Sequence, residues 1–175
     1  MSQTDTIAAL ATPAGRGGIG VIRVSGSLVD QIIEHLFRQA LSVGRVNRRE
    51  FLDHDRRIID DGIALYFQGP HSYTGEDLLE LQGHGGRVVT DMLLKRVLGL
   101  GARSAAPGEF TQRAFLNDKM DLAQAEAVAD LIDSQTVAAA RSAQRSLQGA
   151  FSKHIDALLE AMVQAASQLC APTGE

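Results

Sequence analysis

The stretch YTGEDLLELQGHGG, Tyr73–Gly86, determines how the rest of the chain is interpreted. A turn signal opens it, a short alternating run follows, and one histidine among three glycines ends it. The alternation predicts a strand whose two faces carry, on one side, Leu79 and Leu81 and, on the other, Leu78, Glu80 and Gln82. A carboxylate only accepts hydrogen bonds and can take two parallel N–H bonds from a planar donor. Two positions are therefore open for Glu80: it either lines the wall of a binding cavity or faces water on an edge strand.

Length and composition are those of a soluble protein with one ordinary domain, or a domain with a helical appendage. The 175 residues are 45% hydrophobic and 22% charged. No apolar run approaches the roughly 18–20 residues that span a bilayer, and no signal-peptide pattern opens the chain, so no membrane association is expected. Cys170 is the only cysteine, which excludes an intrachain disulfide and indicates a cytoplasmic protein. A net charge of −4 predicts that this chain alone binds tRNA or other nucleic acid weakly or not at all.

The order of patterns predicts a mixed α+β part followed by helices. Strands are expected at 5–12, 19–25, 58–68 and 78–82, with 41–57 as a connecting loop or a short edge strand. Helices are expected at 28–39, 87–98 and 109–116, the second with an apolar face of Val88, Met92, Leu93 and Val97. Asp121 and Gln124 suit a capping box before a fourth helix, and a long fifth helix is expected over 136–169, with an apolar stripe from Leu147 to Ala166. The predicted division is into residues 1–118 and 119–175.

Other motifs exclude several kinds of site. The glycines of GRGGIG, residues 15–20, lead into a strand rather than a helix, which argues against a dinucleotide site. Gly-Lys occurs nowhere, so these residues contain no P-loop for GTP or ATP. The histidines lack metal-ligand spacing, and His84 lies in a turn or lines a pocket. Lys119 precedes an expected helix, where it opposes the macrodipole; it is either a surface lysine or placed for a ligand.

Three separated stretches carry a resemblance to a known family. They are DTIAALATPAGRGGIGVIRVSG, SYTGEDLLELQGHGG and PGEFTQRAFLNDKMDLAQAEAVADLIDSQT. Over about residues 5–152 the chain resembles the N-terminal part of the tRNA-modification GTPases known as MnmE or TrmE. The resemblance implies an α+β, tetrahydrofolate-binding domain of the aminomethyltransferase type, followed by part of a helical domain. From about Val163 the chain departs from the family pattern, and no G domain follows.

The resemblance also implies functional residues and partners. In the family the first domain binds 5-formyltetrahydrofolate and forms a homodimer, and the folate contacts correspond to Arg23, Glu80 and Lys119. Glu80 suits pterin N–H groups, while the two cations suit carbonyl and carboxylate oxygens. Family members modify C5 of the wobble uridine of tRNA together with an FAD-dependent partner protein. Their GTP hydrolysis, with Mg²⁺ and K⁺, would reside in a domain that this chain lacks.

Two other functions remain open. The first is a stand-alone folate-dependent one-carbon transferase, which needs a general acid or base and offers only Asp118 or Asp121 for that role. The second is a structural dimerisation module with a vestigial pocket. No catalytic residue or metal ligand is assigned, and enzymatic activity of this chain is left undecided.

Overall fold

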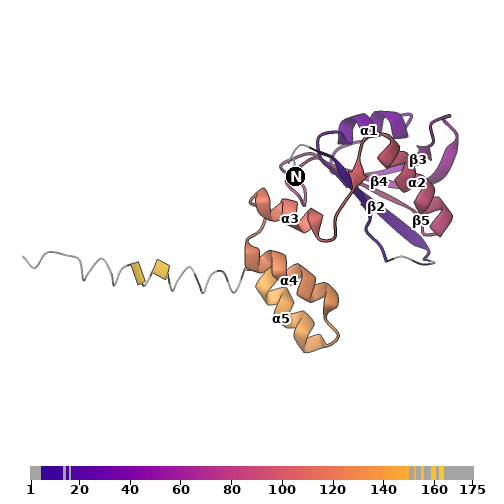
Figure 1. Ribbon diagram of the computed structural model, residues 1–175. Helices are drawn as coiled ribbons and strands as arrows, with labels where there is room; N and C mark the ends of the chain where they lie inside the picture. The colour runs from indigo at the N-terminus through magenta and orange to yellow at the C-terminus, as the bar shows by residue number, and fades with distance from the viewer. Residues whose placement is uncertain are drawn as a thin grey trace, which may run out of the picture. The chain divides into compact units, whose positions relative to one another are not determined.

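The computed structural model describes residues 5–149 except 14 and 16, together with residues 152, 155, 159, 160, 162 and 163. The chain divides into two compact units, Met1–Lys119 and Met120–Glu175. Figure 1 shows the first unit as a sheet with helices and the described part of the second as helical. An α+β part followed by a helical one confirms the predicted fold class.

The first unit is built on one six-stranded sheet in the order β3-β4-β5-β2-β1-β6. The neighbours are antiparallel except β1 and β6, which are parallel. The long stretch between α1 and β4 contains a seven-residue edge strand, β3, so the edge-strand interpretation of 41–57 is correct. The two-residue β6 was not predicted. The strands are β1 Ile7–Leu10, β2 Ile19–Ser25, β3 Val46–Leu52, β4 Ile58–Phe67, β5 Leu78–His84 and β6 Arg103–Ser104.

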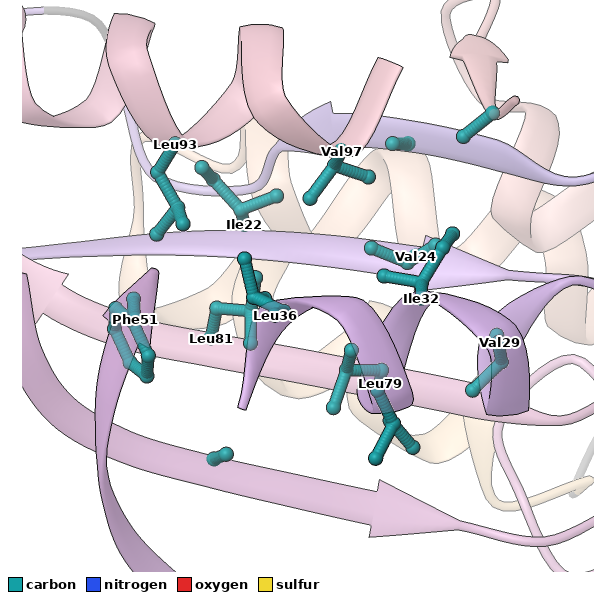
Figure 2. Packing of buried hydrophobic residues seen from close by; sticks show 14 of the residues in the cluster. Ile22, Val24, Val29, Ile32, Leu36, Phe51, Leu79, Leu81, Leu93 and Val97 are labelled. Carbon is teal, nitrogen blue, oxygen red and sulfur yellow. The ribbon is translucent and has the colours of Figure 1, made fainter. Parts of the chain in front are cut away.

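One face of the sheet, here called the core face, is covered by α1 (Val29–Leu36) and α2 (Arg87–Gly99). Figure 2 shows the labelled side chains of these helices beside those of the strands. Leu79 and Leu81 on β5 are 0% exposed and belong to this core, as the alternation predicted. Full burial of such a side chain contributes about 1.5–3 kcal/mol, so this face anchors β5. Its largest fully buried members include Ile22, Val24, Ile32, Leu36, Phe51, Leu79, Leu81 and Val97.

The predicted apolar face of α2 is partly wrong. Leu93 and Val97 are buried, but Val88 is 71% and Met92 46% exposed, and Thr90 takes the third buried position. The methyl group of Thr90 packs against Gly20 of β2, and a Cβ added to Gly20 would lie only 2.5 Å from that methyl group. At about 100° per residue, Val88 and Met92 lie on the opposite side of the helix from Thr90, Leu93 and Val97, so they face away from the sheet, and the small side chain of Thr90 fits where the helix approaches β2.

The bounds of α1 differ from the prediction, whereas those of α3 agree with it. Helix α1 begins after Leu28, its N-cap, whose backbone N–H donates to Thr6 Oγ1, and it ends at Leu36, before the expected end at residue 39. Helix α3, Glu109–Leu116, has the predicted bounds. The second unit contains α4 (Leu122–Asp133), with the predicted Asp121–Gln124 capping box, and α5 (Val137–Leu147).

The expected long fifth helix ends early. Helix α5 stops at Leu147, and Gly149 follows with φ 77°, a left-handed conformation that ends helices and that glycine adopts without strain. Beyond Gly149 the stripe residues that the structure describes, Ile155, Leu159 and Met162, are helical and exposed. The other predicted stripe residues after Leu147 lie outside the described residues. No helix among the residues the structure describes is long and apolar enough to cross a membrane.

Candidate functional site

Arg23 and Glu80 lie opposite each other on adjacent strands, on the sheet face turned away from α1 and α2. The β2–β5 register pairs the two residues directly. Nε and Nη2 of Arg23 both donate to Oε1 of Glu80, at 2.9 and 2.7 Å. The side chains are 29% and 16% exposed, so the pair is half-buried. We call this face the polar face.

The pair leaves hydrogen-bonding capacity unused. Among the residues that the structure describes, nothing donates to Oε2 of Glu80, and Nη1 of Arg23 has no acceptor. A carboxylate has about four acceptor positions, and a guanidinium has five N–H donors. The site can therefore accept an N–H group and donate to an oxygen side by side, which is the complement of an aminopyrimidinone edge.

Two aromatic rings flank Arg23. The guanidinium carbon lies 5.3 Å from the ring centroid of Tyr73 and 5.7 Å from that of Phe110, within the range of cation–π attraction. Tyr73 belongs to the segment 68–77 that connects β4 to β5, and Phe110 lies on α3. The sequence analysis assigned neither ring to the site. Their only signal was membership of the two quoted stretches around Glu80 and Lys119.

A network of buried and partly buried ions fixes α3 and the 68–77 segment to the sheet. Arg113 on α3, 8% exposed, pairs with Glu76 at 3.1 Å, with Glu109 at 3.2 Å and with Asp5 at 2.7 Å. Arg103 on β6 pairs with Glu109 and Asp5. The Arg103 guanidinium, ahead of the backbone N–H of Ala106 and Arg113, lowers the pKa of Glu109 to about 2. The network was not predicted, because it joins residues far apart in sequence.

The same segment reaches β2 through hydroxyl groups. Ser25, two residues beyond Arg23, has its hydroxyl 2.7 Å from that of Thr74 and donates to Glu76 at 2.7 Å. The tyrosine hydroxyl of Tyr73 lies 2.9 Å from Oγ1 of Thr111 on α3. The segment, α3 and the strand of Arg23 are therefore cross-linked at several points.

Lys119 lies apart from the other two predicted site residues. Its Nζ donates to the backbone oxygen of Pro70 at 2.9 Å, and a Cβ built on Gly75 would lie 3.3 Å from its aliphatic stem. No contact joins it to Arg23 or Glu80 among the described residues. What the three share is the 68–77 segment: its Tyr73 packs on Arg23, while its Pro70 and Gly75 contact Lys119. The structure thus brings two of the predicted residues together and places the third on the other side of one loop.

The remaining candidates have structural partners. The carboxylate of Asp60 accepts from the backbone N–H of His84 and lies 2.7 Å from its Nδ1, and a Cβ on Gly83 would come within 2.4 Å of it. Asp121 caps α4, and its pKa is lowered, first by the hydroxyl of Ser152. Asp118 is exposed and has a left-handed φ of 56°.

Three cavities lined by described residues lie away from the Arg23–Glu80 pair. One of about 770 Å³ lies between the Gly15–Gly20 loop and the start of α2, one of about 420 Å³ beside Tyr66 and α1, and one of about 460 Å³ beside Met92 and Lys95. None of these three is lined by Arg23, Glu80 or Lys119. At Gly85, after Glu80, the space of a side chain is taken by the backbone before β2: a Cβ on Gly85 would lie 2.5 Å from the carbonyl oxygen of Gly17.

The fold and the site together define an α+β domain with an ion-paired carboxylate on one sheet face, joined in sequence to an all-helical unit. Comparison with family models identifies both parts. Residues 6–119 match the N-terminus of the GTP-binding protein TrmE, and residues 122–172 match the MnmE helical domain. The chain belongs to the TrmE (MnmE) family, which confirms the resemblance found in the sequence.

Curated relatives agree. The chain is 56% identical over 160 residues to the tRNA modification GTPase MnmE of Chromohalobacter salexigens, 57% over 159 to that of Pseudomonas syringae pv. syringae, and 58% over 160 to that of Methylococcus capsulatus. Each alignment covers 91% of this chain and 35% or 36% of the relative. The chain therefore spans about a third of the length of these relatives and corresponds to their N-terminal and helical domains.

Proposed function

We propose that the first unit binds a tetrahydrofolate, with 5-formyltetrahydrofolate as the expected form, at the Arg23–Glu80 pair. The observation that carries the proposal is the half-buried carboxylate of Glu80, fixed through Oε1 while Oε2 takes no bond from the described residues. The amino and ring N–H groups of a pterin are donors for that oxygen. Nη1 of Arg23 is a donor for the pterin carbonyl.

Lys119 is assigned to the far end of the same ligand. It is exposed, and among the described residues its Nζ donates only to a backbone carbonyl, a neutral acceptor that a carboxylate can replace with a stronger, charge-assisted bond. The folate glutamate tail supplies such a carboxylate. The Tyr73-bearing segment between the pair and Lys119 would then lie along the ligand.

The wider function follows from membership of the family. We assign to the chain the folate-binding and homodimerising part of a tRNA-modifying GTPase that acts on C5 of the wobble uridine in the cytoplasm. A bound folate would supply the one-carbon unit, and an FAD-dependent protein would be the partner. GTP, Mg²⁺ and K⁺ would bind in a G domain outside the residues matched here. These assignments rest on the relatives, all of which are named tRNA modification GTPases.

Titration calorimetry with 5-formyltetrahydrofolate tests the proposal. Glu80→Gln replaces an acceptor by a group that also donates, and we expect affinity to fall roughly ten- to a hundred-fold, the equivalent of about 1.5–3 kcal/mol. Glu50→Gln on β3, 48% exposed in its side chain and paired to Arg38 at 4.0 Å, is the matched control and should bind as the parent does. Equal affinity of the two variants would refute the site. Turnover of the folate by the chain would favour the one-carbon transferase instead.

A further inference from the structure

The two rings beside Arg23 come from separate segments, yet they meet at one guanidinium. Tyr73 lies on the segment before β5, and Phe110 lies 37 residues later on α3; their centroids are 5.3 and 5.7 Å from the same carbon. Both residues are partly buried. The Arg23–Glu80 pair therefore has aromatic surfaces beside it as well as hydrogen-bonding groups.

The positions of the rings are fixed before any ligand binds. The Tyr73 hydroxyl is 2.9 Å from Thr111, the neighbour of Phe110 on α3. Glu76, three residues after Tyr73, is paired to Arg113, three residues after Phe110. Since these links join the two ring-bearing segments directly, little conformational entropy is lost when a ligand meets the rings, and preorganisation of this kind raises affinity.

We propose that Tyr73 and Phe110 are specificity-determining residues that hold the flat aminopyrimidinone ring of the folate, an inference that rests on the proposed function. A guanidinium is a flat, delocalised group with N–H donors in its plane. The structure surrounds it with a carboxylate at the N–H edge and two aromatic rings. An aminopyrimidinone ring is also flat and also has N–H donors in its plane. The carboxylate and the two aromatic rings that contact Arg23 therefore also suit such a ring, placed beside Arg23 at the unbonded Oε2 of Glu80.

The alternative is that the rings only shield the Arg23–Glu80 ion pair from water. In that case their replacement would change stability without changing which part of the ligand is recognised. If the rings contact the ligand, their replacement lowers the affinity for compounds that carry the aminopyrimidinone ring. The affinity for the tail fragment p-aminobenzoylglutamate then stays the same.

Binding of three probes separates the two roles: 5-formyltetrahydrofolate, tetrahydropterin without the tail, and p-aminobenzoylglutamate. We expect Phe110→Leu and Tyr73→Leu to bind the first two about ten-fold more weakly and the third unchanged. Tyr73→Phe, which keeps the ring, should stay close to the parent. The matched control is Phe115→Leu on the same helix, whose side chain is exposed (38%) and should have no effect.

A second measurement needs no variant. The chain has two tyrosines, Tyr66 and Tyr73, and Tyr66 lies on the core face with its hydroxyl bonded to Asp30. In a chain with ¹³C-labelled tyrosine, titration with 5-formyltetrahydrofolate should shift the Tyr73 ring signal and leave that of Tyr66 in place. Folate binding with an unmoved Tyr73 signal, or with full affinity in both leucine variants, would overturn the inference and leave the proposed function standing. No folate binding by the parent chain would overturn both.

Discussion

The two faces of the central sheet are stabilised by different interactions. On the core face, Ile22, Leu79 and Leu81 are almost fully buried and pack against two helices. On the polar face, Arg23, Glu80 and the carboxylates around Arg113 are held by ion pairs and hydrogen bonds. The free energy gained by apolar burial grows with the apolar area removed from water and does not depend on direction, whereas a buried charge needs partners in definite positions. The difference explains why a binding site can form on the polar face, where oriented groups keep spare donors and acceptors.

The largest expected effect is on the core face. Leu81→Ala removes a fully buried side chain between β5 and the helices, and large-to-small changes of this kind cost about 3–4 kcal/mol of unfolding free energy. Urea unfolding followed by tyrosine fluorescence measures it, because Tyr66 and Tyr73 both lie in the first unit and the chain has no tryptophan.

The control for Leu81 lies on the next strand and the other face. Ile63 is 37% exposed and pairs with Gln82 in the β4–β5 register. Ile63→Ala should lower the unfolding free energy by less than about 1 kcal/mol. Equal losses for the two alanine variants would show that the faces do not differ in apolar burial as described.

An intermediate effect is expected from acid on the polar face. The carboxyl of Glu109 has its pKa lowered from 4.5 to about 2, chiefly by the hydrogen bond from Arg103. A depressed pKa in the folded state gives stability that is complete above the unfolded value and is lost as the pH falls toward the folded value. The parent chain should therefore lose about 2 kcal/mol through this group between about pH 5 and pH 2, after allowance for solvent around the partly exposed Arg103.

Glu109→Gln isolates that contribution. The variant should be less stable than the parent at pH 7, and the gap should close as the pH falls to 2. Some acid sensitivity will remain, because the pKa of Asp5 is also lowered, again first by Arg103. A gap that stays constant over this range of pH would mean that Glu109 does not titrate as the structure implies. Urea unfolding at a series of pH values gives the answer.

The difference between the core face and the polar face also explains which parts of the structure could be predicted from the sequence. The core face follows a local rule, since alternation along β2 and β5 places alternate residues on one side. The existence of β1, β2, β4 and β5, the bounds of α3 and the α4 capping box were predicted correctly. Val88 and Met92 were misassigned because the predicted face was drawn too wide: at about 100° per residue they lie opposite Thr90 on the helix. The fifth helix was predicted to be continuous because the apolar stripe passes through Gly149, where the structure interrupts the helix.

The polar face depends on long-range partners that no local pattern encodes. Arg23 and Glu80 were selected through the family resemblance, and their direct pairing needed the β2–β5 register. Arg113 and the two rings were missed because Asp5, Glu76 and Arg23, which they contact, are tens of residues away. Glu109 was missed although its partners Arg103 and Arg113 lie within six residues. The polar residues inside PGEFTQRAF were a signal, since buried charges such as Glu109 and Arg113 occur in pairs, but the partners could not be named.

The smallest expected effect concerns the His84–Asp60 pair at the end of β5. His84 ends β5 with its side chain 71% exposed, while its partner Asp60 is 9% exposed. The hydrogen bond that the His84 ring donates to the Asp60 carboxylate, ahead of charge attraction to the same group, raises the pKa of His84 above 6.5. A raised folded pKa gives stability that is present below 6.5 and is lost as the pH rises through the folded value. For so exposed an imidazole, we expect a clear shift in titration and little change in unfolding.

Histidine ring NMR signals, followed from pH 5 to 9, measure that titration, and the signal missing from His84→Gln assigns it. Asp60→Asn should bring the midpoint of His84 down toward 6.5, since it removes both main causes of the shift. Asp61→Asn, which removes only the weakest of the causes, is the matched control and should move the midpoint less. A midpoint that is the same in both variants would show that the buried carboxylate does not hold the imidazole. The strand end would then owe its position to the backbone ladder and to the contact of Gly83 with Asp60 alone.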